Sequence, residues 1–172
     1  QDNNKLGPTA QSRISMLPTI YNVDAFAYSS DLVANLSDGE EESWAWLFDE
    51  RWRRRCATSN DPAASIVELA LAAVSAGLIE VADIGNLTIE EIDARFDLLM
   101  RRKKAGYLMR SWASHEESVR MMSMPGNLLG SLWSPAFYEL RARGHDIIYA
   151  APKEGYRGWH SGLSLSAALS DE

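Results

Sequence analysis

Two places in the sequence join a predicted strand to a predicted helix and carry residues that can bind a ligand. The first is Ser59-Asn60-Asp61-Pro62 and the second is Trp133-Ser134-Pro135. In open α/β sheets, ligands bind beyond the carboxyl ends of the strands, where helix N-termini present amide groups to an anion. Asp61 can instead hold a cation. The alternative is that Asp61 and Ser134 only cap the helices that follow them.

Two tryptophans, Trp133 and Trp159, are the next candidates, because each stands beside a predicted turn or strand end with serine or glycine neighbours. An indole in this setting can keep one face open for stacking or for a cation–π contact. The alternative is ordinary core packing. His160 and Ser161 follow Trp159 directly and are flanked by glycines at 158 and 162, so they join the candidate ligand-binding residues.

Other reactive residue types form no recognisable site. His115, His145 and His160 share no metal-ligand spacing, so we expect no metal site. The single cysteine, Cys56, excludes a disulfide framework and is typical of a buried strand position. Neither a nucleophile elbow nor a phosphate or dinucleotide loop is present, and we expect no cofactor. The basic runs at 51–55 and 101–104 are typical of solvated turns and helix ends.

The elements that must position these residues alternate between strands and helices. Asp61 and Pro62 suit the N-cap and first turn of a helix, and Thr88 with Glu91 forms a capping box. Predicted strands and extended segments cover 14–17, 20–28, 56–59, 107–112, 128–133, 146–150 and 158–166, and predicted helices cover 43–48, 63–76, 89–104, 115–124 and 135–143. This order predicts an α/β fold with a mixed, mostly parallel sheet flanked by helices.

Two finer expectations concern packing. Ile89, Ile92, Phe96 and Leu99 recur at helical spacing, which predicts that they form the buried face of their helix. The tryptophans in the 43–52 segment are interpreted as structural, because that segment reads as an amphipathic helix and turn.

Composition sets the broad class. The chain has 172 residues, 46% of them hydrophobic, which suits one globular domain. Its 17 basic and 24 acidic residues give a net charge of −7, which disfavours nucleic-acid binding. No apolar run approaches the roughly 18 residues that a membrane span needs.

Four segments together resemble one known family. They are Ser43-Trp44-Ala45-Trp46-Leu47-Phe48-Asp49 with Trp52, the strand and turn over 57–62, Leu129-Gly130-Ser131-Leu132-Trp133-Ser134, and Tyr149-Ala150-Ala151-Pro152-Lys153-Glu154-Gly155 continuing to Trp159. In order and spacing they resemble the extracellular solute-binding proteins of ABC importers, of the spermidine/putrescine-binding type. The resemblance covers roughly residues 14–166.

The resemblance implies a periplasmic-binding-protein-like fold, in which two α/β lobes joined by crossing strands hold a ligand between them. It places a tail and a strand remnant of the first lobe at 1–19, the second lobe at 20–158 and the return crossover at 159–172. Most of the first lobe is then missing, and an apolar face is expected to be exposed where it would pack.

The resemblance also assigns candidate residues. Trp133, Trp159 and Asp61 fall where polyamine binders hold their ligand. Two acidic residues of that pattern are replaced, by Ala64 and Ser161. Buried ammonium groups need carboxylates, so an amino-acid-like or carboxylate solute is an alternative to a polyamine or related amine. Tyr21 and Asn22 on the inbound crossover, and Trp112, are secondary candidates.

The expected function is capture of a small polar solute for ABC permease subunits in the inner membrane, without catalysis. The expected location is periplasmic, or extracellular with a lipid tether, and the full-length protein is expected to be a monomer. One alternative is a small α/β hydrolase or transferase that uses Asp61 or His160 as a base. Another is a purely structural interaction domain.

Overall fold

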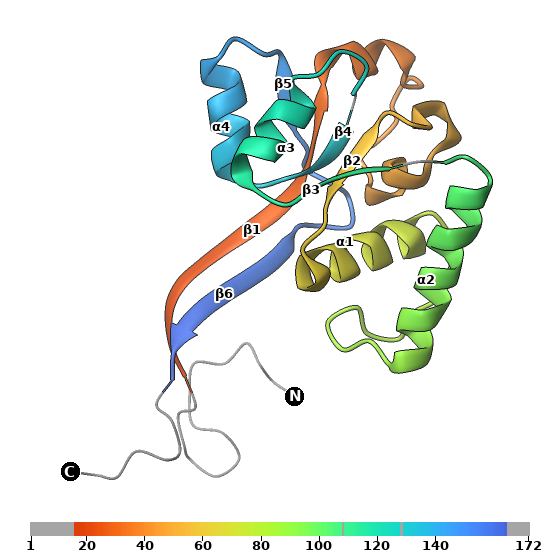
Figure 1. The fold of residues 1–172 in the computed structure, drawn as a ribbon, viewed down its shortest axis with the longest axis vertical. Coiled ribbons are helices and arrows are strands. Elements are labelled where there is room, and N and C mark those ends of the chain that lie inside the picture. Colours follow the sequence, from red (N-terminus) through yellow and green to blue (C-terminus); the bar gives the residue numbers. More distant parts are fainter. Residues whose placement is uncertain (1–15, 108, 128, 165–172) are drawn as a thin grey trace. The chain divides into compact units, whose positions relative to one another are not determined.

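The computed structural model describes residues 16–107, 109–127 and 129–164 (Figure 1). The predicted tail at 1–13 and the outer ends of the first and last predicted extended segments lie outside the described residues. The strands are β1 (Leu17–Ser29), β2 (Cys56–Ser59), β3 (Arg110–Trp112), β4 (Leu129–Leu132), β5 (Ile147–Tyr149) and β6 (Arg157–Leu163). The α-helices are α1 (Pro62–Ser75), α2 (Ile89–Lys104), α3 (His115–Met122) and α4 (Ser134–Ala142), and the 3-10 helices are η1 (Ser30–Asn35), η2 (Trp44–Phe48) and η3 (Glu50–Trp52).

The chain divides into two compact units. The larger unit is Asp24–Arg157, and the smaller unit holds the segments on either side, described over 16–23 and 158–164. In the smaller unit β6 pairs with β1, and Thr19 Oγ1 donates a hydrogen bond to the Ser161 carbonyl at 3.2 Å. A Cβ at Gly162 would lie 2.6 Å from the Leu17 carbonyl oxygen, so the close approach of these segments requires glycine.

The sheet is mixed, as predicted. Its order is β3-β2-β4-β1-β5, with β6 beside β1. β2 runs parallel to β3 and β4, whereas β1 runs antiparallel to β4 and β5. The parallel share is smaller than predicted, because the long strand β1 enters the sheet in the opposite sense. Pro18 does not divide β1 into two segments, since it stands next to the first residue of the strand, where a missing N–H costs little.

Helices cover both faces of the sheet, and each face has its own core (Figure 1). Phe26 on β1 belongs to the core that includes α1 and the 3-10 helices, and the adjacent Ala27 belongs to the core under α3 and α4. This alternation is the period-two pattern of a strand. The structural interpretation of three tryptophans is confirmed: Trp44, Trp46 and Trp52 are all buried in the first core.

The helix starts agree with the sequence better than the helix faces do. Thr88 and Glu91 form the predicted capping box of α2. The predicted buried face of that helix is right only in part. Leu99 packs against the first core and Ile92 is half-buried, but Ile89 is 73% exposed and Phe96 is also exposed. The buried residues of α2 are Arg95 and Leu98. The guanidinium of Arg95 lies over the Phe96 ring and donates to the Ser65 carbonyl on α1 at 3.4 Å. The Arg95 stem therefore fills the contact with α1 that an apolar side chain was expected to fill.

Candidate functional site

The carboxyl ends of the three parallel strands meet at one edge of the sheet. β2 ends at Ser59 and β3 ends at Trp112, and these two residues are register partners. The backbone N–H of Asn60 donates to the Trp112 carbonyl at 2.8 Å, which holds the loop after β2 against the end of β3. β4 ends beside them and leads into Trp133. The two predicted strand-to-helix junctions thus lie on the same edge.

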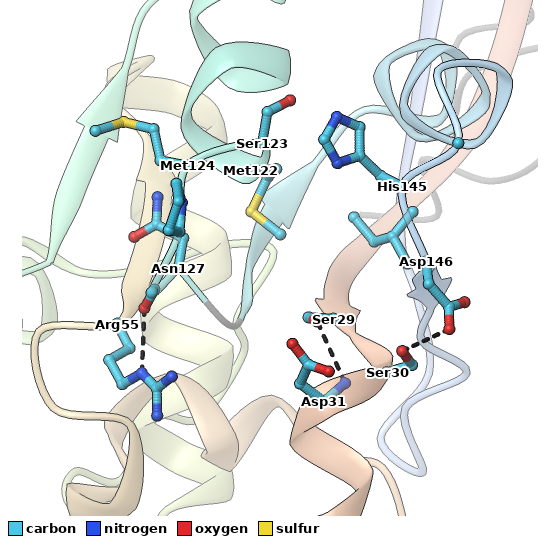
Figure 2. A pocket seen from close by; sticks show the side chains of 14 residues that line it. Ser29, Ser30, Asp31, Arg55, Met122, Ser123, Met124, Asn127, His145 and Asp146 are labelled. Carbon is cyan, nitrogen blue, oxygen red and sulfur yellow. Dashed lines mark hydrogen bonds between the residues drawn. The ribbon is translucent and has the colours of Figure 1, made fainter.

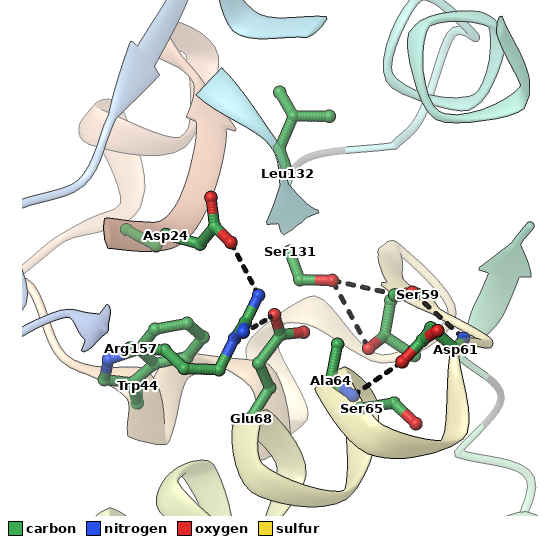
Figure 3. Close-up of polar contacts among 12 residues, drawn as sticks. Asp24, Trp44, Ser59, Asp61, Ala64, Ser65, Glu68, Ser131, Leu132 and Arg157 are labelled. Carbon is green, nitrogen blue, oxygen red and sulfur yellow. Dashed lines mark hydrogen bonds and ion pairs between the residues drawn. The ribbon is translucent and has the colours of Figure 1, made fainter. Parts of the chain in front are cut away.

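A serine network fixes the backbone of this edge. The hydroxyl of Ser131 on β4 accepts a hydrogen bond from the Ser59 backbone N–H at 2.9 Å and donates to Thr58 Oγ1 at 3.4 Å. The Ser59 hydroxyl in turn accepts from the Asp61 backbone N–H at 3.0 Å. Figure 3 shows Ser59, Asp61 and Ser131 together near the start of α1. Two of these bonds join β4 to β2 and the third lies within the β2–α1 junction, so the junction is held before any ligand arrives.

Asp61 is the N-cap of α1. Its Oδ1 accepts a hydrogen bond from the Ala64 backbone N–H at 2.7 Å, and Pro62 occupies the first turn. The capping role considered for Asp61 is therefore confirmed. The side chain is also exposed, so its second carboxylate oxygen can still accept a donor from a ligand.

Trp133 is half-buried and rests on a second tryptophan. Its ring meets that of Trp112 edge to face, with 4.9 Å between the centroids and 87° between the planes. Trp112 is only 1% exposed, and its Nε1 donates to the Ser131 carbonyl at 3.2 Å. Direct ligand contact, the role suggested for Trp112, does not fit this burial. Trp112 instead lies behind Trp133 and supports its ring. Trp133 itself keeps part of its surface exposed.

Ser134 does not cap α4, so the capping alternative considered for it is wrong. The N-cap position is Trp133, Ser134 is the first helical residue, and no side chain caps the helix. The reason is a shift of one residue: Pro135 lies in the second helical position, so the serine that precedes it is already helical. The side chain of Ser134 is half-buried at the same edge as Trp133.

A buried charge cluster lies near the start of α1, and the sequence did not predict it. Arg157 donates from Nε to Glu68 Oε1 at 3.0 Å and from Nη2 to Asp24 Oδ2 at 2.6 Å (Figure 3). Asp24 and Glu68 are almost fully buried. Burial raises the pKa of Glu68, against the opposing effect of Arg157, and Glu68 Oε2 has no hydrogen-bond partner among the described residues.

One sequence signal pointed to this cluster. Glu68 is the only carboxylate in the helix that was predicted over 63–76, which is otherwise apolar nearly all round. A lone acidic residue on a buried helix needs a cation. The sequence does not say which cation, because Arg157 lies 89 residues further along the chain.

The remaining predicted residues belong to the smaller unit. Tyr21 on β1 is 87% exposed and Asn22 is half-buried. On β6, Trp159 is half-buried, and His160 and Ser161 are exposed. Because these five residues lie in the other unit, the convergence expected for Trp133, Trp159 and Asp61 stays a prediction.

No group of three or more histidine, cysteine, aspartate or glutamate side chains is arranged to hold a metal ion within 16–107, 109–127 and 129–164. In the same part of the chain, no helix combines the length and the apolar character that crossing a membrane requires.

Comparison with known proteins gives similarity in structure but not in sequence. No family model and no curated protein matches the chain. A substrate-binding protein of a Bradyrhizobium japonicum ABC transporter superposes with a TM-score of 0.64 at 15% identity, over 92% of this chain and 45% of that one. The spermidine/putrescine substrate-binding protein of Streptococcus pneumoniae gives 0.59 at 13% identity, over 91% and 44%. A glucopine complex of a binding protein from A. tumefaciens gives 0.63 at 15% identity, over 92% and 46%.

These similarities define the fold. The chain has a periplasmic-binding-protein-like fold, which confirms the predicted class, and the resemblance to ABC solute-binding proteins seen in the four sequence segments is confirmed at the level of structure. The chain spans less than half the length of each of these three proteins.

Proposed function

We propose that this chain belongs to the solute-binding component of a bacterial ABC importer and captures a small polar solute without catalysis. The fold supports this proposal, and the observation that carries it is the arrangement of Trp133. Its half-exposed ring stands on buried Trp112 at the carboxyl edge of the parallel strands, where α/β folds bind ligands.

In this proposal the solute lies between two lobes, with Trp133 and Trp159 as walls and the exposed carboxylate of Asp61 on a polar group. Ser134, His160 and Ser161 add hydrogen-bonding groups, and Tyr21 and Asn22 line the inbound crossover. Lobe closure is then a hinge motion in the two crossing segments. The partners are permease subunits in the inner membrane, and the protein works in the periplasm or tethered by lipid outside the cell, as a monomer when full length.

The charge of the solute is part of the proposal. A polyamine or related amine remains the first candidate, because Asp61 and two indoles suit a cation. Position 64 holds alanine, and the next carboxylate on that helix, Glu68, already pairs with Arg157. An amino-acid-like or carboxylate solute is therefore the second candidate. The similar proteins named above are described with spermidine/putrescine and with glucopine, so this fold serves more than one solute.

Calorimetric titration of the full-length protein, which supplies both lobes, tests the proposal. The probes are spermidine, putrescine, a set of amino acids and small carboxylates. We expect one class to bind, and we expect Trp133→Ala and Trp159→Ala each to weaken its binding about 5- to 30-fold, since stacking and cation–π contacts contribute roughly 1–2 kcal/mol. Tyr138→Ala, which removes an exposed aromatic from α4, is the matched control and should leave binding unchanged.

The alternatives give different results in the same experiments. Unchanged binding in both tryptophan variants would remove the assigned site. Turnover of any probe that is lost in Asp61→Asn or His160→Gln would instead favour the hydrolase or transferase alternative. Binding of none of the probes, with the protein folded, would favour an interaction domain.

A further inference from the structure

Within the larger unit, a pocket lies at the opposite end of the sheet from Trp133, beyond the carboxyl end of β1 and the amino end of β4. Its volume is about 300 Å³, which is at the lower end of the range for small-molecule sites. It opens between the end of β1, the turn after α3 and the turn before β5 (Figure 2). These segments meet there because β1 runs antiparallel to β4 and β5, so the end of β1 lies beside the starts of the other two.

Each wall of the pocket is held by its own hydrogen bonds. On one side, Arg55 Nε donates to the Gly126 carbonyl at 3.1 Å, and the Leu129 backbone N–H donates to the Arg55 carbonyl at 3.3 Å. On the other side, Ser30 donates to Asp146 twice, from its backbone N–H to the carbonyl at 3.1 Å and from its hydroxyl to Oδ2 at 2.7 Å. The pocket is therefore formed before a ligand enters it.

The two walls carry side chains of opposite charge, and neither charge is paired with another described residue. Arg55 uses Nε in its wall, and its two Nη groups have no hydrogen-bond partner among the described residues. The carboxylate of Asp31 likewise has none in the described part of the chain, although its backbone N–H donates to Ser29 Oγ. Figure 2 shows the guanidinium and the carboxylate facing each other across the opening. Buried Met122 and Ile147 also line the pocket.

We propose that this pocket binds a small zwitterion, with the ligand carboxylate on Arg55 and the ligand ammonium on Asp31. A guanidinium with two unused nitrogens suits a carboxylate in a bidentate pair. A ligand with only one charge would leave the opposite wall unpaired. Asp146 is already paired with Arg141 at 3.5 Å. The charges left at the pocket are therefore those of Arg55 and Asp31, which sum to zero and suit a zwitterion. This site is separate from the solute site proposed above and does not rest on it.

Nuclear magnetic resonance titration of the isotopically labelled full chain with alanine tests the proposal. We expect alanine to shift the backbone amide signals of Asp31, Arg55 and Gly126. N-acetylalanine lacks the ammonium and alaninamide lacks the carboxylate, so each should bind at least about tenfold more weakly, as expected for loss of a charge-assisted hydrogen bond. Equal binding by either blocked compound, or no shift with alanine at millimolar concentrations, would overturn the proposal.

Variants assign the binding to this pocket. Arg55→Gln and Asp31→Asn should each weaken alanine binding about tenfold or more, whereas the exposed α2 variants Arg101→Gln and Asp97→Asn should not change it. Asp31→Asn keeps the backbone bonds that the structure shows for this residue, so it tests the pocket even if Arg55→Gln fails to fold. Trp133→Ala should leave alanine binding intact. Loss in Trp133→Ala with none in Asp31→Asn would place alanine in the other site and refute this one.

Discussion

The two strand-to-helix junctions have similar sequences and different structures. Both place a polar residue before a proline, at Asp61-Pro62 and at Ser134-Pro135. At the β2–α1 junction the carboxylate of Asp61 caps the helix, whereas at the β4–α4 junction no side chain does. Trp133 occupies the N-cap position of α4. A shift of one residue relative to proline therefore decides whether the junction closes its own helix or presents an indole at the sheet edge.

The residues that support the two junctions differ in the same way. At the β4–α4 junction, the ring of Trp133 contacts buried Trp112, whose Nε1 donates a hydrogen bond to the Ser131 carbonyl on β4. Along α1, Glu68 reaches Arg157, which also holds Asp24. One support is aromatic and neutral, and the other is ionic and buried. We expect the ionic support to be costly to break and its contribution to stability to depend on pH. We expect the contribution of the aromatic support to depend on neither pH nor ionic strength.

Breaking the ionic support should have the largest effect on stability. Arg157→Met removes the guanidinium and leaves Asp24 and Glu68 buried without it. We expect a loss of about 3–5 kcal/mol in the free energy of unfolding, because an uncompensated buried charge is strongly unfavourable. Urea denaturation of the full chain measures this loss. A loss below about 1 kcal/mol would contradict the idea that the pairs seen in the structure are formed in solution.

The pH dependence of stability should sharpen the comparison next. Burial raises the pKa of Glu68 in the folded state. The contribution of Glu68 to the free energy of unfolding is therefore fully present below the ordinary carboxyl pKa and is lost as the pH rises through the folded-state pKa. The charged neighbours are Arg157 and Asp24, and the nearby phenol of Tyr149 also has a raised pKa. Glu68→Gln should remove this fall, which can reach at most about 1.4 kcal/mol per pH unit.

Unfolding curves of the parent and of Glu68→Gln, recorded from about pH 4 to pH 8, check this expectation. Asp97→Asn is the control, because it removes an exposed carboxylate from α2. Identical curves for the parent and the glutamine variant would mean that Glu68 titrates alike in the folded and unfolded states.

The smallest expected effects compare the two polar residues that precede a proline, Asp61 and Ser134. Asp61→Ala removes the hydrogen bond to the Ala64 backbone N–H and should lower stability by about 1 kcal/mol, the usual value of an N-cap. Ser134→Ala removes no cap and should change stability by less than about 0.5 kcal/mol. Thermal or urea unfolding of the pair measures the difference. Equal losses would show that Ser134 stabilises α4 in some other way.

Local patterns predicted much of this molecule. Asp61 and Pro62 marked the start of α1, and the alternation of strands and helices gave the fold class, since both depend on neighbours in sequence. The buried face of α2 was predicted only in part because Arg95 packs against α1 through its stem, which a count of apolar residues does not register. The charge cluster was missed because Arg157 lies 133 residues from Asp24. Such contacts follow from topology, which single residues do not encode.

The position of Cys56 has a practical consequence for measuring motion. The thiol is buried, its Sγ donates to the Trp52 carbonyl, and burial raises its pKa to about 12. It therefore remains protonated and inert toward maleimide dyes near neutral pH. As it is the sole cysteine in the sequence, dyes attached to two new surface cysteines, one in each unit, would report their separation by resonance energy transfer without replacement of the native cysteine.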